Sequence, residues 1–101
     1  MNAVVIYRLE ARFTGNPSYE FTQPEIGATH KCLLFMAQQT EEGQYEAALN
    51  ECLKFGFSDI IFGGHGTLQP GVLDTEEFKG FSGHYEEALN EGSSLIFYPN
   101  A

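Results

Sequence analysis

The chain has 101 residues, of which 43% are hydrophobic and 14% aromatic, and its formal net charge is −9 at pH 7. A chain of this length and composition is expected to fold as a single domain over residues 1–101, with a hydrophobic core of its own. Only five Lys and Arg stand against 14 Asp and Glu. This balance excludes the clustered basic surface that nucleic acids or anionic membranes require, so we expect neither as a partner.

No apolar run approaches the ~20 residues that a helix needs to cross a bilayer. The first residues, Met1 to Ile6, lack the basic segment and the cleavage site of a secretory signal peptide. We therefore expect a cytoplasmic protein. In that reducing compartment, Cys32 and Cys52 are expected to be small core side chains without a disulfide bond, since both lie among apolar residues.

Apolar and polar residues alternate over residues 5–13, which predicts a strand with one buried and one largely solvated face. Residues 14–17 form a turn signal, and the weak alternation of Tyr19 and Phe21 suggests a short edge strand or a packed loop. Residues 31–37 are apolar on both sides. This pattern predicts an interior strand, with a buried helix as the alternative.

An eight-residue sequence occurs twice, because residues 44–51 and 84–91 are identical at six positions. The similarity indicates either a duplicated unit or two amphipathic helices of like composition. Apolar residues around the first copy recur with helical spacing, which predicts a helix from about residue 41 to about residue 55. Gly56 is placed to end this helix, and the apolar residues 58–62 predict the next strand.

The chain between the two copies is expected to be mostly loop, since glycine and proline are frequent in residues 63–71. Residues 74–77 match an acidic capping box and predict a short helical turn. Ser82 is a candidate cap for the second repeated helix, which should end at Gly92. Residues 94–98 predict the last strand.

The order strand–(strand)–strand–helix–strand–helix–strand predicts an α/β fold that borders on α+β. Strand–helix–strand crossovers favour parallel strands, and the alternating first strand suits an antiparallel edge, so we expect one mixed sheet of four to five strands. The two main helices should cover this sheet as a small two-layer sandwich. If the strand order reverses midway, the helices should lie on opposite faces instead.

A glycine-rich segment directly follows a predicted strand, which is where α/β proteins bind ligands. The segment consists of Gly63, Gly64, His65, Gly66 and Thr67. Its glycine spacing matches neither a dinucleotide-binding fingerprint nor a P-loop. The glycines therefore either allow a tight turn or, together with His65 and His84, contribute to a site for a small ligand.

The three histidines, His30, His65 and His84, lack the close spacing that marks zinc sites. No nucleophile lies in a recognisable strained turn, and the acidic pairs such as Glu86 and Glu87 are adjacent, so on a helix they diverge by about 100°. We therefore expect no metal ion, no cofactor and no catalytic residue.

Ten of the 14 acidic residues lie within residues 41–51 and 74–91, which are the predicted helices and the segment before the second one. If both helices share one sheet face, their outer carboxylates form an acidic surface, which either keeps the protein soluble or binds a basic protein. The candidate partner-binding residues are Glu42, Glu46, Glu51, Glu86, Glu87 and Glu91.

The leading functional hypothesis is a non-enzymatic acidic binding protein that captures a basic protein partner. Its charge and size are like those of immunity proteins and of inhibitors that imitate DNA, a comparison that rests on charge and size alone. The alternative is a small-molecule-binding or metal-binding protein, or a minor enzyme, that uses Gly63–Thr67 with His65. A homodimer is also expected if both helices share one face, because the helix-free sheet face would leave a large apolar patch exposed. The alternative is that the loop of residues 14–29 folds over this face.

Overall fold

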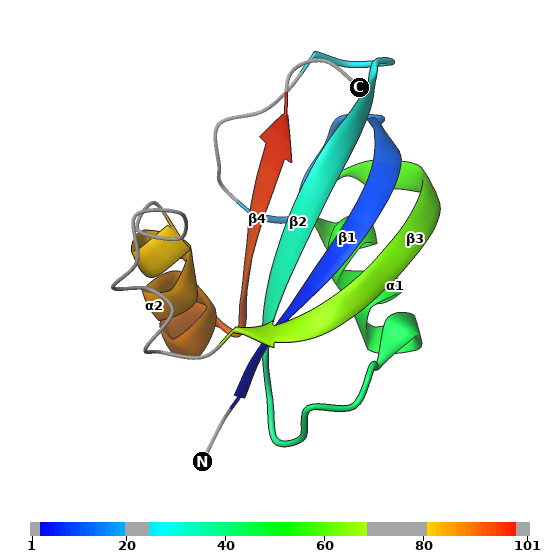
Figure 1. The fold of residues 1–101 in the computed structure, drawn as a ribbon. Helices are drawn as coiled ribbons and strands as arrows, with labels where there is room; N and C mark the ends of the chain where they lie inside the picture. The colour runs from blue at the N-terminus through cyan, green and yellow to red at the C-terminus, as the bar shows by residue number, and fades with distance from the viewer. Residues whose placement is uncertain (1–2, 20–24, 69–80, 99–101) are drawn as a thin grey trace.

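Two helices and four strands make up the part of the chain that the computed structural model describes, which is residues 3–19, 25–68 and 81–98. In chain order the elements are β1 (Ala3–Phe13), β2 (Thr29–Gln38), α1 (Tyr45–Lys54), β3 (Phe57–Leu68), α2 (Ser82–Glu91) and β4 (Ser93–Tyr98) (Figure 1). The fold is α+β, since the four strands form a single antiparallel sheet.

The strand order in the sheet is β3-β1-β2-β4, and each strand runs antiparallel to its neighbours. The prediction of an interior strand at residues 31–37 is confirmed, because β2 pairs with both β1 and β4. The predictions of a mixed sheet and of an edge position for the first strand are wrong. β1 pairs with β2 and β3, and its alternating pattern arises because one of its faces is only partly covered.

The glycine-rich segment is part of a strand rather than the expected loop, because β3 continues through it to Leu68. Its pairing with β1 shifts between Arg8 and Leu9, where Gly63 is the extra residue on β3. Gly64 has a φ of 137°, and a Cβ atom at this position would lie 2.9 Å from the guanidinium of Arg8. The glycines therefore allow a β-bulge and the close passage of an arginine side chain.

α1 packs on one face of the sheet, over the larger of two hydrophobic clusters. Side chains of β1 from Val5 to Phe13 at every second position, together with Ala48 and Cys52 of α1, are buried there. The other buried members are Cys32, Leu34, Met36, Phe55, Phe57 and Leu95. Both cysteines are free and buried, as predicted.

α2 packs on the opposite face, where Ala88 contacts a smaller cluster with Val4 and Phe35. Figure 1 shows α1 behind β1 and β3, and α2 at a distance from it, next to β4. The expected two-layer sandwich with both helices on one face is therefore wrong, and the alternative with opposite faces is confirmed. The physical reason is that α1 already covers the first face. α2 lies on the connection from one edge strand, β3, to the other, β4, and the opposite face is the one still available to it.

The predicted helix ends at Gly56 and Gly92 are confirmed, since both glycines have the left-handed conformation that follows a helix, with φ values of 90° and 97°. The helix starts differ from expectation. α1 begins four residues later than predicted, at Tyr45, and α2 begins at Ser82, so that Phe81 and not Ser82 occupies the cap position.

Two predicted elements lie wholly or partly outside the described residues. These are the helical turn after residues 74–77 and the edge strand with Phe21; Tyr19 itself lies in a bend. Within the described residues, no helix has the length and apolar character needed to span a membrane.

Candidate functional site

The six carboxylates predicted to bind a partner are distributed over both helices and the segment before α1. All except Glu51 are exposed, and none of the exposed five forms an ion pair within residues 3–19, 25–68 and 81–98. Glu42 precedes α1, Glu46 lies in its first turn, and Glu86, Glu87 and Glu91 belong to α2. Because the helices lie on opposite faces, the expected single acidic surface over one sheet face is not formed.

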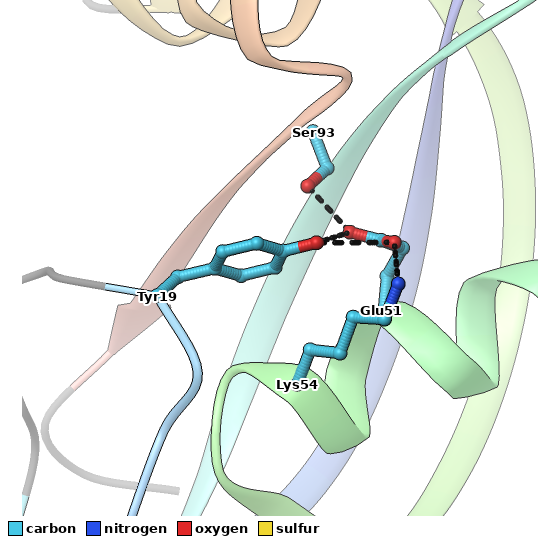
Figure 2. A network of polar contacts seen from close by, with 4 residues as sticks. All are labelled: Tyr19, Glu51, Lys54 and Ser93. Carbon is cyan, nitrogen blue, oxygen red and sulfur yellow. Dashed lines mark hydrogen bonds and ion pairs between the residues drawn. The ribbon is translucent and has the colours of Figure 1, made fainter.

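Glu51 differs from the other five because it binds three side chains of the same chain (Figure 2). Its Oε2 accepts hydrogen bonds from Ser93 Oγ at 2.7 Å and from the Tyr19 hydroxyl at 3.0 Å. Lys54 Nζ lies 3.4 Å from Oε1. The network connects α1 with the segment after β1 and with the start of β4, so Glu51 holds together parts of the chain that are distant in sequence.

The network also affects the acid–base properties of its members. Burial raises the pKa of the Tyr19 phenol above its ordinary value of 10.0, and the hydrogen bond to Glu51 and its negative charge add to this shift. A hydrogen bond to the same carboxylate raises the pKa of Lys54. Tyr19 is neutral and Lys54 protonated around neutral pH even at their ordinary pKa values, and both shifts extend this state, which the hydrogen-bond pattern needs, to higher pH.

A cavity of about 350 Å³ lies directly beside this network. It is lined by Tyr19, Phe55, Glu87, Glu91 and Ser93. The rings of Tyr19 and Phe55 are 4.8 Å apart and form an aromatic wall. Glu87 and Glu91 contribute negative charge from α2, and two lining residues, Tyr19 and Ser93, bind the Glu51 carboxylate. Three of the six predicted acids are thus brought together here, at the junction of α1, α2 and β4.

No sequence pattern identified Tyr19, Phe55 or Ser93 as residues of a site. Phe55 was identifiable as an apolar residue at the end of the first repeated helix. Tyr19 and Ser93 carried no local signal, because they meet Glu51 only through contacts over 32 and 42 residues. A pairing over such distances depends on the tertiary fold.

His65, the centre of the predicted ligand segment, is exposed and points to the same side of the sheet as α1. Its Nδ1 lies 2.6 Å from the Tyr45 hydroxyl, and its ring lies 5.8 Å from the ring of Tyr7. Gly43 is close enough that a Cβ atom there would lie 2.6 Å from the imidazole. His65 therefore lies against a cluster of aromatic residues around the start of α1.

His84 is on the other face of the sheet, so the structure does not bring it together with His65. Its Nδ1 lies 2.7 Å from Ser94 Oγ, and its ring stacks on Phe35 with the centroids 5.6 Å apart. Of the other members of the segment, Thr67 is paired with Val5 in the sheet, and Gly63 faces a shallow groove on the side away from His65. Gly66 has no neighbour within 4 Å of a built Cβ atom.

The described residues contain neither a metal-binding cluster nor a reactive thiol. No group of three or more His, Cys, Asp or Glu there is arranged to hold a metal ion. Burial raises the pKa of Cys32 and that of Cys52 to about 12, so neither thiol is a nucleophile at neutral pH.

Comparisons of the chain with protein-family models, with curated protein sequences and with solved structures returned no match. The function is therefore argued from the residues and their geometry.

Proposed function

We propose that this protein is a non-enzymatic binding protein that captures a basic protein partner through the carboxylates of its helices. The observation that carries the proposal is that five predicted partner-binding acids, Glu42, Glu46, Glu86, Glu87 and Glu91, are exposed and form no ion pair within the described parts of the chain. A basic partner supplies the missing counter-charges.

Glu87 and Glu91 are one helical turn apart on α2, and like charges at this spacing destabilise a helix by a few tenths of a kcal/mol. A cationic group between or beside them removes this repulsion. The cost in the free protein is small, but it adds to the self-repulsion of a chain with a net charge of −9. Binding a basic surface therefore relieves both local and global repulsion.

The cavity beside Glu51 fits an anchoring Lys or Arg side chain of such a partner. The aliphatic part of the side chain would lie against the aromatic wall of Tyr19 and Phe55 and bury apolar surface there. The cationic end would meet Glu87 and Glu91. By charge and size the protein is suited to act as an inhibitor of the immunity type, with electrostatic attraction speeding the encounter.

The experiment is a comparison of charge-neutralising variants in partner capture at low salt. Immobilised wild-type protein is expected to retain a basic protein that high salt releases, because salt screens exposed charges. The variant Glu87→Gln/Glu91→Gln should bind this protein about tenfold more weakly, equivalent to about 1.4 kcal/mol. Isothermal titration with the identified partner gives the affinities.

The matched control is Glu25→Gln/Asp59→Asn, which removes the same amount of charge at residues that do not line the cavity. We expect this variant to bind nearly as tightly as the wild type, since both residues are exposed and neither lines the cavity. If both variants bind the partner equally weakly, the loss of affinity is due to net charge alone and not to the cavity. Absence of any salt-sensitive basic partner would contradict the proposed function.

A further inference from the structure

One pair of side chains outside the cavity joins a hydroxyl group to a base at the protein surface. The Tyr45 hydroxyl lies 2.6 Å from Nδ1 of His65, which is hydrogen-bond distance. Tyr45 is the first residue of α1 and is 37% exposed, and His65 lies on β3 and is also exposed. Neither residue lines the cavity beside Glu51. The pair is therefore accessible to a small molecule and separate from the cavity.

The β-bulge in β3 turns His65 toward this side of the sheet. Between Phe62 and His65 the strand advances three residues, while the paired strand β1 advances two. Because side chains alternate along a strand, residues three apart normally point to opposite faces. The extra residue, Gly63, brings Phe62 and His65 to the same face, the one on which Tyr45 lies.

Residue 43 leaves the space that the imidazole occupies. A Cβ atom on Gly43 would lie 2.6 Å from Cε1 and 2.9 Å from Nδ1 of His65, and 2.9 Å from the ring of Tyr45. Gly43 is not among the glycines with a positive φ, so its backbone conformation is open to other residues. Glycine is required here by the contact between the two side chains and not by the backbone.

Aromatic neighbours from the sheet hold the Tyr45 ring. Tyr7 and Phe62 both meet this ring edge to face, with centroids 5.4 and 5.1 Å away. Tyr7 is itself fixed, because it is fully buried, and its hydroxyl donates a hydrogen bond to Gln38 and accepts one from the backbone N–H of Gln44 at 2.8 Å. The position of the Tyr45 hydroxyl is therefore preorganised.

A hydroxyl group that is hydrogen-bonded to an imidazole is the arrangement that activates a nucleophile. When the neutral imidazole carries its hydrogen on Nε2, Nδ1 of His65 accepts the hydrogen bond of the Tyr45 hydroxyl and is placed to take its proton. The phenol oxygen gains negative charge as it attacks, so removal of the proton at the same time lowers the barrier.

We propose that Tyr45 is a nucleophile that takes up a group from a small electrophile, with His65 as its general base. The electrophile is an activated acyl or sulfonyl compound with an anionic leaving group. The phenol oxygen forms a bond to the acyl carbon or sulfonyl sulfur, and the leaving group departs with the electron pair of the bond that breaks. The phenol proton passes to Nδ1 of His65 and then to solvent. The proposal is independent of the proposed function, because neither residue belongs to the partner-binding carboxylates or to the cavity.

Labelling with benzenesulfonyl fluoride tests the proposal. The phenol oxygen bonds to the sulfur of this probe, fluoride leaves, and mass spectrometry of peptides locates the sulfonate ester. Tyr98 is the internal reference, because it is 43% exposed and its hydroxyl forms no hydrogen bond within the described ranges. Tyr45 should be labelled about 100-fold faster than Tyr98, which is the lower end of what a positioned general base contributes.

Two variants remove the base in different ways. His65→Gln should lower the rate at Tyr45 about 100-fold, because an amide accepts the hydrogen bond but does not take the proton. Gly43→Ala should lower it at least about tenfold, because the methyl group displaces the end of the His65 side chain. The matched control is Gly66→Ala, which has no atom within 4 Å of the added methyl group and should keep the wild-type rate. Circular dichroism verifies that every variant is folded.

Three results overturn the proposal. The first is equal labelling of Tyr45 and Tyr98 in the wild type, which would mean that the imidazole does not activate the phenol. The second is an unchanged rate at Tyr45 in folded His65→Gln. The third is equal loss of labelling in Gly43→Ala and Gly66→Ala, which would show that the position of the imidazole is irrelevant.

Discussion

The two copies of the repeated sequence have the same local structure in different surroundings. Ala48 and its equivalent Ala88 are both 0% exposed, while Leu49 and Leu89 are 38% and 39% exposed. Each helix is followed by a left-handed glycine and then by an edge strand of the sheet. The repeat therefore specifies a helix, the residue that it buries and the strand that follows.

One difference between the two helices begins after the eighth residue of the repeat. α1 continues for another turn, which places Cys52 and, just past the helix, Phe55 in the larger cluster. α2 ends at Glu91, directly after its copy of the repeat, and contacts the smaller cluster. The contribution of a helix to stability therefore depends on its own sequence, on the sheet face that it covers and on the residues that follow it.

The largest expected effect is the loss of stability when a buried aromatic residue is removed, and it should differ between the two clusters. Phe57→Ala on the α1 side should lower the free energy of unfolding by about 4–5 kcal/mol, because the enclosed site cannot collapse around the cavity. Phe35→Ala on the α2 side should cost about 3 kcal/mol, since the smaller cluster around it can relax more. Urea denaturation measures both. Equal costs would mean that the two faces are equally rigid.

The two left-handed glycines, Gly56 and Gly92, differ in the space around them. Gly92→Ala should cost about 1–2 kcal/mol, the penalty of the left-handed conformation, because no atom lies within 4 Å of the added methyl group. Gly56→Ala should cost about 1–3 kcal/mol more, since the methyl group would lie 2.9 Å from the Phe13 ring and 3.0 Å from the Gly15 carbonyl oxygen. Thermal unfolding compares them, and equal stabilities would argue against this packing.

Glu51 and Glu91 occupy equivalent positions of the repeat but differ in their contacts. Glu51→Ala should lower stability by about 1–3 kcal/mol, because it leaves the Tyr19 and Ser93 hydroxyl groups without their acceptor. Glu91→Ala should stay within about 0.5 kcal/mol, as expected for an exposed side chain. Chemical denaturation of both variants, with Glu51→Gln as the conservative control, measures the difference. Equal stabilities would show that the network contributes nothing.

The smallest expected effect is a dependence on alkaline pH. The pKa of Tyr19 is raised in the folded state, so its stabilising contribution is complete below the ordinary value of 10.0 and is lost as the pH rises through the higher folded value. Tyr19→Phe should remove this part of the alkaline destabilisation. Denaturation of both proteins between neutral pH and about pH 11 measures it; identical pH profiles would contradict the role assigned to Tyr19.

Part of the candidate site was accessible from the sequence. The concentration of acids on the two helices identified Glu51, Glu87 and Glu91, which meet at the cavity, because helical periodicity locates exposed positions. It did not separate Glu51, which has internal partners, from the other two. The interpretation of Gly63–Thr67 as a loop is wrong because glycines also occur where a strand must bulge around a neighbouring side chain, here that of Arg8.

The sequence by itself determined the local structure of this protein, since periodicity, glycine positions and apolar runs act over a few residues. It predicted the strands around residues 5–13 and 31–37, the helix ends at Gly56 and Gly92 and the last strand. Only the tertiary structure decided the strand order and the opposite sides of the two helices. These depend on which surfaces remain uncovered once α1 has packed, and no local pattern encodes the competition between distant segments for the same sheet face.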